Sequence, residues 1–245
     1  MGLRIKTVEE VKKKLSQFFK MTDCGEMQHF LGMKIAYDRT PGKMQFSQGA
    51  SIEKMLKKFG MNDCNPTRTP MEKGLQLTCS NTGTVNEPYR EVLGSLMYVM
   101  MSTRPDIRFP VGYLGRFQQE PEQLHWTALK RVVRYMKGTK DMFLEFSRGK
   151  DVEPLVGFTD SDWATDTVDR KSVSGFLFQV YGNTVSWSSK KQTTVATSSS
   201  EAEYVALSAG VTEAIWLTGL LGDLGVKITK PIPIYEDNRG CIGMA

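Results

Sequence analysis

The order of elements after residue 150 is the feature of the sequence that most restricts the fold. Three short β-type runs, residues 155–160, 174–181 and 184–188, are separated by turn residues. A helical segment begins near Ser198, and residues 232–235 start a fourth strand. Three strands, a helix and another strand are typical of a mixed α/β sheet in which the fourth strand lies parallel beside the first.

Turn and capping residues mark the element boundaries in this region. Gly182-Asn183 predicts a tight hairpin turn between the second and third strands. Ser198 and Ser200 each stand three residues before a glutamate, so either one predicts a Ser-x-x-Glu capping box at the start of the helix. The expected apolar stripe of that helix consists of Tyr204, Leu207, Val211 and Ile215.

The first 150 residues have a different pattern, which predicts helices and one β-hairpin. Helical periodicity covers residues 8–19, 52–59, 89–102 and 123–137, and residues 27–48 have hairpin character. Beside its apolar stripe, the last helix carries the basic residues Lys130, Arg131, Arg134 and Lys137. These residues form either a solvated face or a phosphate-binding face. Since the pattern changes at residues 149–151, we predict two domains, 1–150 and 151–245.

The net charge of +5 is divided unequally between these regions. Residues 1–150 carry 25 Lys and Arg against 15 Asp and Glu, whereas residues 151–245 carry 7 against 12. A basic region can bind a polyanion by counterion release, and an acidic region concentrates carboxylates. Two solvated surfaces that merely differ would give the same numbers, so charge alone leaves both interpretations open.

The sequence lacks the motifs that mark several other classes of protein. No stretch approaches the roughly 18 apolar residues of a membrane helix, so we expect no membrane association. The four cysteines form no CxxC pair, the histidines number two, and no glycine-rich phosphate loop or dinucleotide motif occurs. The four tryptophans are expected to be core or partly buried packing residues rather than platforms on which bases stack. The acidic residues are therefore the candidates for a catalytic or metal-binding site.

Three carboxylates stand where strands end and the helix begins. Asp160 ends the first predicted strand, Asp237 follows the fourth, and Glu203 lies about one turn inside the helix. If the two strands are neighbours the three side chains can converge, and a divalent cation would relieve their mutual repulsion. Hard oxygen ligands suit Mg²⁺ or Mn²⁺, and two such ions about 4 Å apart can activate water and stabilise a leaving oxygen in phosphodiester hydrolysis.

Each acid also has a purely structural interpretation. Asp160 could shape a loop, Glu203 could complement the helix macrodipole, and Asp237 could cap a helix that begins at Asn238. Asp162 competes with Asp160 for the metal-binding role, because residues two apart share one face of a strand. The strand ending favours Asp160.

Five motifs carry a resemblance to a known family. Their order and spacing resemble the ribonuclease H region of copia-type LTR retrotransposon Pol polyproteins. The motifs are GFTDSDWA at 157–164, DRKSVSG at 169–175, SWSSKKQ at 186–192, SSSEAEY at 198–204 and EDN at 236–238.

The first 150 residues resemble the part of the same polyprotein that follows the reverse transcriptase catalytic motif. Phe30-Leu31-Gly32 resembles the primer-grip hairpin, and residues 94–98, 103–107 and 134–139 resemble thumb and connection segments. The implied fold is a ribonuclease H-like mixed α/β sheet with flanking helices, truncated at its C-terminal side and preceded by a mainly helical thumb and connection region with a β-hairpin.

The resemblance implies ribonuclease H type hydrolysis of the RNA strand of an RNA–DNA hybrid with two Mg²⁺ or Mn²⁺ ions. Asp160, Glu203 and Asp237 match the catalytic and metal-binding positions of the family. Implied partners are a hybrid or template-primer duplex and the remainder of the Pol polyprotein, inside the cell in a cytoplasmic particle or the nucleus. Expected nucleic-acid contacts are Phe30, Leu31, Gly32, Arg170, Lys171, Lys190 and Lys191.

The chain also departs from the family pattern. No Tyr-x-Asp-Asp motif of the polymerase centre occurs, so DNA synthesis by this chain alone is not expected. The sequence ends at Ala245, within the expected helix after the third acid, and a fourth metal-binding acid is therefore expected to be missing. A noncatalytic nucleic-acid-binding remnant is the main alternative to a hybrid-cleaving enzyme. A different two-metal nuclease of the same fold, such as an integrase-like domain, is a third interpretation.

Overall fold

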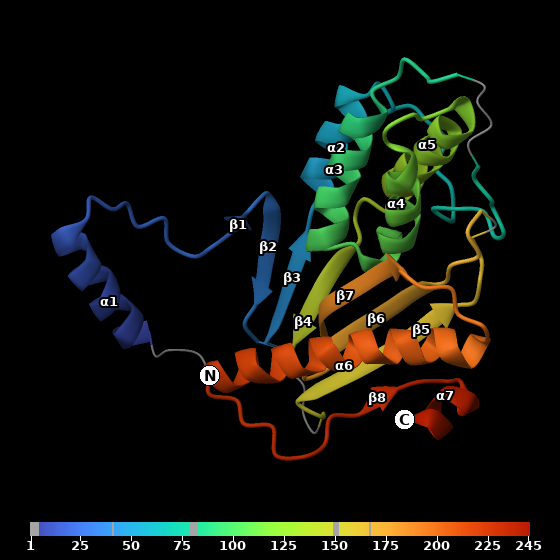
Figure 1. The fold of residues 1–245 in the computed structure, drawn as a ribbon. Helices are drawn as coiled ribbons and strands as arrows, with labels where there is room; N and C mark the ends of the chain where they lie inside the picture. The colour runs from blue at the N-terminus through green and yellow to red at the C-terminus, as the bar shows by residue number, and fades with distance from the viewer. Residues whose placement is uncertain (1–4, 41, 79–82, 149–151, 167) are drawn as a thin grey trace.

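The computed structural model describes residues 5–40, 42–78, 83–148, 152–166 and 168–245. Within these ranges the chain is a mixed α/β protein with two four-stranded sheets and flanking helices (Figure 1). The expected domain boundary at 149–151, Pro41 of the expected hairpin turn and Cys79 lie outside the described residues.

The first sheet is antiparallel and has the strand order β1-β2-β3-β4. The expected hairpin is confirmed as β2 and β3, whose pairing runs from Lys34↔Ser47 to Asp38↔Lys43. The strand β4 comes from the far end of this region and pairs with β3. The strand bounds are β1 (His29–Phe30), β2 (Met33–Asp38), β3 (Lys43–Ser47) and β4 (Phe143–Ser147).

The helices between residues 49 and 138 form a helical lobe, which packs beside this sheet around one apolar cluster. The expected helices are confirmed, and the expected stripe of the last one, with Trp126, Leu129, Val133 and Met136, is buried. The first helix stands apart in Figure 1, with Val11 and Phe18 exposed. The helices are α1 (Ile5–Phe18), α2 (Gly49–Lys58), α3 (Tyr89–Ser102), α4 (Arg108–Leu114) and α5 (Gln123–Gly138), with 3₁₀ turns η1 (Pro105–Ile107) and η2 (Gly115–Phe117).

The second sheet has the order β7-β6-β5-β8 and carries the candidate acids. The strand β8 is parallel to β5, with Gly157↔Ile234 and Phe158↔Tyr235 in register. The expected parallel pairing of the first and fourth strands in chain order is therefore confirmed. In Figure 1 the long helix α6 lies along this sheet, and α7 lies near the N-terminal end of α6. The bounds are β5 (Leu155–Asp162), β6 (Val173–Val180), β7 (Asn183–Lys191), α6 (Ser199–Asp223), β8 (Ile234–Tyr235) and α7 (Arg239–Met244).

The hairpin turn between β6 and β7 differs from the prediction by one residue. Val180 pairs with Asn183, so the two loop residues are Tyr181 and Gly182. Both have positive φ, 48° and 75°, which is the backbone of a type I′ turn. The prediction of Gly182-Asn183 was wrong because Asn183 already belongs to the ladder, where its side-chain amide bonds to the carbonyls of Val180 and Tyr181.

Of the two candidate caps of α6, the structure selects Ser198. The Ser198 hydroxyl accepts a hydrogen bond of 3.2 Å from the Glu201 backbone N–H. In a complete capping box the Glu201 carboxylate would accept the backbone N–H of Ser198. Here it accepts the backbone N–H of Thr197 instead, at 2.6 Å. This arrangement starts the helix at Ser199 and leaves Glu203 in its second turn.

The helix α6 buries a different face from the predicted stripe. Tyr204, Val211 and Ile215 are 44%, 41% and 69% exposed. The reason is close backbone approach: a Cβ on Gly210 would lie 2.5 Å from Cγ2 of Thr159 in β5. Small side chains let the helix sit directly on the sheet, and its buried residues are Ala202, Glu203, Ala206, Gly210, Ala214, Leu217 and Leu221.

Among the described residues, α6 is also the one helix whose length and apolar composition would allow it to cross a membrane. Those two properties are weak evidence of a span, because core helices of water-soluble proteins share them. Here the helix carries Glu203 and Glu213 and covers the second sheet.

The second sheet contacts both the helical lobe and the first sheet. Arg116 in η2 forms an ion pair of 2.8 Å with Asp166 of the loop after β5. The backbone of Ser147 in β4 exchanges two hydrogen bonds with the side chain of Asn183. These contacts hold the acidic sheet against the basic part of the chain.

Candidate metal centre

Asp160, Glu203 and Asp237 converge at one end of the second sheet. Each offers a carboxylate oxygen, and the three oxygens lie within 4.8 Å of one another. The acids come from the end of β5, the second turn of α6 and the residues just after β8. Parallel pairing of β5 with β8 brings the two aspartates to the same edge, and α6 lays Glu203 over them.

Glu203 is the buried member of the group, whereas both aspartates are exposed. Burial, followed by the negative charges of Glu236, Asp160 and Asp237, raises the pKa of Glu203 to about 7. A hydrogen bond from the Ser161 backbone N–H opposes this shift. Its Oε2 is buried without a hydrogen-bond partner in the described part of the chain. An acceptor in this state is suited to a cation.

Asp162, the competitor of Asp160, has a structural role. Its carboxylate accepts the Val173 backbone N–H at 2.5 Å and the Thr165 hydroxyl, which closes the loop between β5 and β6. Asp160 makes no ion pair among the described residues and faces the other two acids. Asp160, not Asp162, therefore lies in the cluster of acids, but the predicted strand ending was wrong, because β5 continues past Asp160 to Asp162. The metal-binding role of Asp160 stays a prediction.

Glu236 was not singled out by the sequence, although it adds to the charge around Glu203. Its carboxylate accepts the Thr159 hydroxyl and the Asn238 backbone N–H, each at 3.0 Å. Asn238 caps α7 by accepting the Cys241 N–H at 2.9 Å. Because Glu236 is held by these donors, Asp237 is the residue left to join the cluster.

Gln192 is a second residue that sequence reasoning missed. Its buried carboxamide nitrogen donates to the Ala202 carbonyl and the Ser174 hydroxyl, both at 2.9 Å, and lies 3.4 Å from the Ser161 hydroxyl. Ala202 precedes Glu203, and Ser161 follows Asp160. One side chain thus ties the helix and the strand that carry two of the acids. The sequence gives no signal of this role beyond the position of Gln192 in a family motif.

The four cations predicted to contact nucleic acid are not equally available. Lys191 is paired with Asp166 at 2.5 Å and with Asp169 at 2.8 Å, so its charge is balanced. Lys171 lies 4.0 Å from Asp169. The remaining two, Arg170 and Lys190, are exposed and form no ion pair among the described residues.

The predicted primer-grip residues form a tight turn on the surface. Phe30 ends β1, and Leu31 and Gly32 are the two loop residues before β2, with φ of 47° and 69°. Phe30 and Leu31 are exposed, and the Tyr98 hydroxyl of α3 donates to the Leu31 carbonyl. The turn is therefore anchored to the helical lobe while its apolar side chains face solvent.

Most of the basic face of α5 contacts protein. Arg134 and Lys137 donate to the backbone carbonyls of Asn65 and Cys64 at 2.6 and 2.7 Å. Arg131 pairs with Glu72 at 2.7 Å. These cations hold the segment between α2 and α3 in place, so a face that could have been solvated or phosphate-binding is largely structural.

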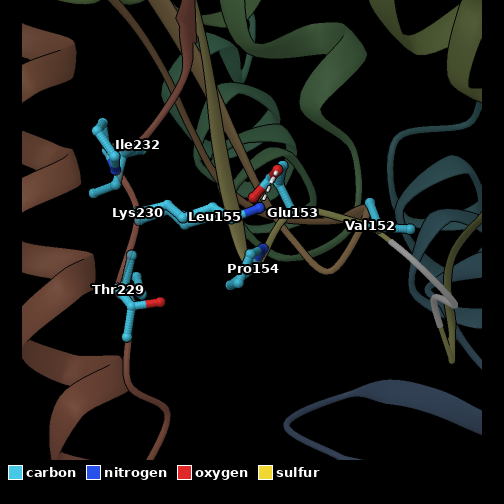
Figure 2. A pocket seen from close by; sticks show the side chains of 9 residues that line it. Val152, Glu153, Pro154, Leu155, Thr229, Lys230 and Ile232 are labelled. Carbon is cyan, nitrogen blue, oxygen red and sulfur yellow. Dashed lines mark ion pairs between the residues drawn. The ribbon is translucent and has the colours of Figure 1, made fainter.

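A cavity of about 360 Å³ opens at the opposite end of β5 from the acids. Figure 2 shows it between residues 152–155 and the segment that leads to β8, with Lys230 and Glu153 paired across it at 3.8 Å. Leu155, at its wall, is five residues before Asp160, which is about 16 Å along a strand. The cavity is thus separate from the candidate metal centre.

Comparison with known proteins identifies the family. Residues 1–73 match the family described as reverse transcriptase (RNA-dependent DNA polymerase). The Pol polyprotein from transposon TNT 1-94 of Nicotiana tabacum is 39% identical over 97% of this chain and 18% of its own length. The putative transposon Ty5-1 protein of Saccharomyces cerevisiae is 32% identical over 85% of this chain and 68% of its own length. The chain belongs to the copia-type retrotransposon Pol family.

The expected family resemblance is thereby confirmed, and it extends to proteins with other descriptions. The secreted RxLR effector protein 161 of Plasmopara viticola is 51% identical over 54% of this chain and 93% of its own length. The chain spans less than a fifth of the Pol polyproteins from tobacco and Arabidopsis thaliana that it matches, 18% and 15%. No solved structure matches it significantly.

Proposed function

We propose that residues 151–245 form a ribonuclease H-like domain that hydrolyses the RNA strand of RNA–DNA hybrids, and that residues 1–150 bind the backbone of the template-primer duplex. The convergence of Asp160, Glu203 and Asp237 carries this proposal. Membership of a Pol family supports it, because such polyproteins act on nucleic acid. The net charge of the first 150 residues also suits a polyanion.

The donor set fits Mg²⁺ or Mn²⁺. All three side chains offer hard oxygen atoms, and the described residues place no cationic side chain in an ion pair with any of them. Oε2 of Glu203 is buried without a hydrogen-bond partner among the described residues, and burial, followed by the charges of the neighbouring acids, raises the pKa of Glu203; both observations support a bound cation. Divalent ions bound there would activate a water molecule for attack on phosphorus and stabilise the leaving oxygen.

The protein's own residues would position the substrate around this centre. Asp160 and Asp237 are exposed and would face an approaching phosphodiester, whereas Glu203 is buried on α6. Arg170 and Lys190 are the two predicted cations that form no ion pair with any described residue, and they would bind flanking phosphates. Lys191 instead fixes the loop after β5 by its ion pairs.

A cleavage assay on the full chain tests the proposal. The substrate is an RNA–DNA hybrid labelled on the RNA, incubated with Mg²⁺ and, separately, with EDTA. We expect Mg²⁺-dependent RNA products from the wild type and at least about a 100-fold loss of rate in Asp160→Asn, which removes a charged ligand. Hybrid binding without any metal-dependent product would instead support the noncatalytic nucleic-acid-binding remnant, and cleavage of duplex DNA but not of the hybrid would support a different two-metal nuclease.

A further inference from the structure

A groove of about 860 Å³ lies between the helical lobe and the second sheet. One wall is the segment 69–76 with Arg131 of α5, and the other is formed by residues 162–165 with Arg170. Asp162 on this wall is two residues after Asp160 on β5, which is about 7 Å along the strand. The groove therefore adjoins the candidate metal centre but is lined by different residues.

The unbalanced charge in this groove is positive. Glu72 is paired with Arg131, whereas Asp162 accepts only the uncharged Val173 N–H and Thr165 hydroxyl and keeps its negative charge. The lining holds three basic residues against these two acids, so its net charge is +1. Lys73 and Arg170 line the groove, are exposed, and form no ion pair among the described residues. The available electrostatic partner is thus an anion.

The groove also contains a fixed aromatic surface. Trp163 is 51% exposed, so about half of a side chain that was expected only to pack, in the core or partly buried, is open to solvent. Its indole N–H donates to the Ala196 carbonyl at 3.3 Å, which anchors one edge of the ring. An anchored, exposed indole in a groove that also holds cationic side chains is an arrangement on which proteins stack unpaired bases while they bind the phosphates.

We propose that this groove binds a single-stranded nucleic acid segment, with a base stacked on Trp163 and phosphates near Lys73 and Arg170. Inside a duplex the neighbouring base pairs cover both faces of each base, so the proposed occupant is a strand that extends beyond a duplex rather than the body of the duplex. The inference rests on the proposed function in one respect: the bound strand is the continuation of the hybrid held at the acids.

Fluorescence anisotropy on the full chain tests this assignment. Titrations use a labelled RNA–DNA hybrid, either blunt or with a short single-stranded extension at each of its four ends in turn, in EDTA. We expect at least one extended hybrid to bind more tightly than the blunt one. Trp163→Leu should remove that advantage, weakening binding of the extended hybrid about 10-fold, and should leave the blunt hybrid unaffected.

Matched variants separate stacking from general effects. Trp163→Phe keeps an aromatic face and should retain most of the advantage. Trp216→Leu changes an indole that is 59% exposed on α6, outside the groove, and should have no effect. Lys73→Gln should reduce the salt dependence of extended-hybrid binding but not of blunt-hybrid binding, whereas Lys227→Gln, an exposed lysine outside the groove, should change neither.

Because the titrations contain no divalent metal, they do not depend on cleavage. Equal binding of blunt and extended hybrids by the wild type would overturn the groove assignment and leave the nuclease proposal standing. An equal loss in Trp163→Leu and Trp216→Leu, at unchanged circular dichroism, would overturn it too. Absence of Mg²⁺-dependent products, with the extension effect intact, would overturn the nuclease proposal alone.

Discussion

The indole N–H of Trp187 in β7 donates a hydrogen bond of 3.1 Å to the main-chain carbonyl of Met100 in α3. The bond joins the second sheet to the helical lobe. Trp187→Phe removes the donor and leaves a carbonyl at the lobe contact without its partner, so we expect the free energy of unfolding to fall by about 1 to 2 kcal/mol. Urea unfolding measures this, and Trp216→Phe, at an exposed site, is the control. An equal stability of the two variants would show that the bond does not hold the lobes together.

Asp160 and Asp162 should respond to neutralisation in opposite ways. Asp160 repels the buried Glu203, so without divalent metal Asp160→Asn should raise the melting temperature. Asp162→Ala removes the acceptor of Val173 and Thr165 and should lower it. Differential scanning fluorimetry in EDTA checks both directions.

The same two variants separate metal binding from stability. A ligand that binds only the folded state raises the melting temperature with concentration. MgCl₂ should therefore stabilise the wild type and Asp162→Ala but not Asp160→Asn. If only Asp162→Ala lost the Mg²⁺ response, Asp162 rather than Asp160 would be the metal ligand.

Gln192 should act as a positioning residue for the acids. Gln192→Ala releases Ala202 of α6 from Ser174 and Ser161, so Glu203 loses its fixed position relative to Asp160. We expect the Mg²⁺ concentration for half-maximal hybrid cleavage to rise several-fold while KM for the hybrid stays unchanged. The control is Gln179→Ala, at the far end of β6. A fall in melting temperature with an unchanged Mg²⁺ midpoint would reduce Gln192 to a purely structural role.

The placement of the three acids could be predicted because it depends on local pattern. Each aspartate directly follows a run of apolar strand residues or lies close after it, and the strand order fixes which strands are neighbours. The buried face of α6 could not be predicted in this way. Apolar residues surround the helix, and the face that packs is chosen by how closely Gly210 approaches Thr159.

Tertiary contacts also decided the roles of individual polar residues. The cations Arg134 and Lys137 were predicted as one surface, but they bond to a segment some 70 residues earlier in the chain, at Asn65 and Cys64. Lys190 and Lys191 are adjacent in sequence, yet only Lys191 reaches Asp166. Spacing along one element does not contain such information, since a partner distant in sequence determines it.

The ion pair between Arg104 and Asp106 should make stability depend on pH in the acid range. Arg104 is buried and donates to both oxygens of Asp106 at 2.9 and 2.7 Å. Burial alone would raise the pKa of Asp106, but hydrogen bonds and charge from Arg104, with a further bond from Tyr135, lower it below its usual value. A lowered pKa in the folded state adds stability above the unfolded pKa of about 3.9 and loses it as the pH falls through the folded value.

Asp106→Asn tests this dependence, because it leaves the buried guanidinium without a charge partner. We expect a loss of about 3 kcal/mol at pH 7, with the difference from the wild type shrinking as the pH falls below about 4. Asp23→Asn, at an exposed pair with Lys12, should change stability little at any pH. Urea unfolding at a series of pH values provides the measurement, and a difference that stays constant down to the acid limit would contradict the assignment.

The contact between Gly210 and Thr159 predicts a sharp contrast between two glycines of the same helix. A Cβ at Gly210 would lie 2.5 Å from Cγ2 of Thr159, whereas a Cβ at Gly219 would meet no atom within 4 Å. Gly210→Ala should therefore destabilise the protein by about 1 to 3 kcal/mol through overpacking. Gly219→Ala should stabilise it by about 0.5 to 1 kcal/mol through helix propensity.

Rescue by a second change shows whether this contact is the cause. Thr159→Ser removes Cγ2 but keeps the hydroxyl that donates to Glu236, so it should recover much of the stability lost in Gly210→Ala. The double-mutant cycle, measured by urea unfolding, should give a favourable coupling energy of about 1 kcal/mol. Strict additivity of the two changes would mean that α6 moves away from β5 as a whole. That movement would also displace Glu203 from Asp160, and the variant would then require more Mg²⁺ for hybrid cleavage.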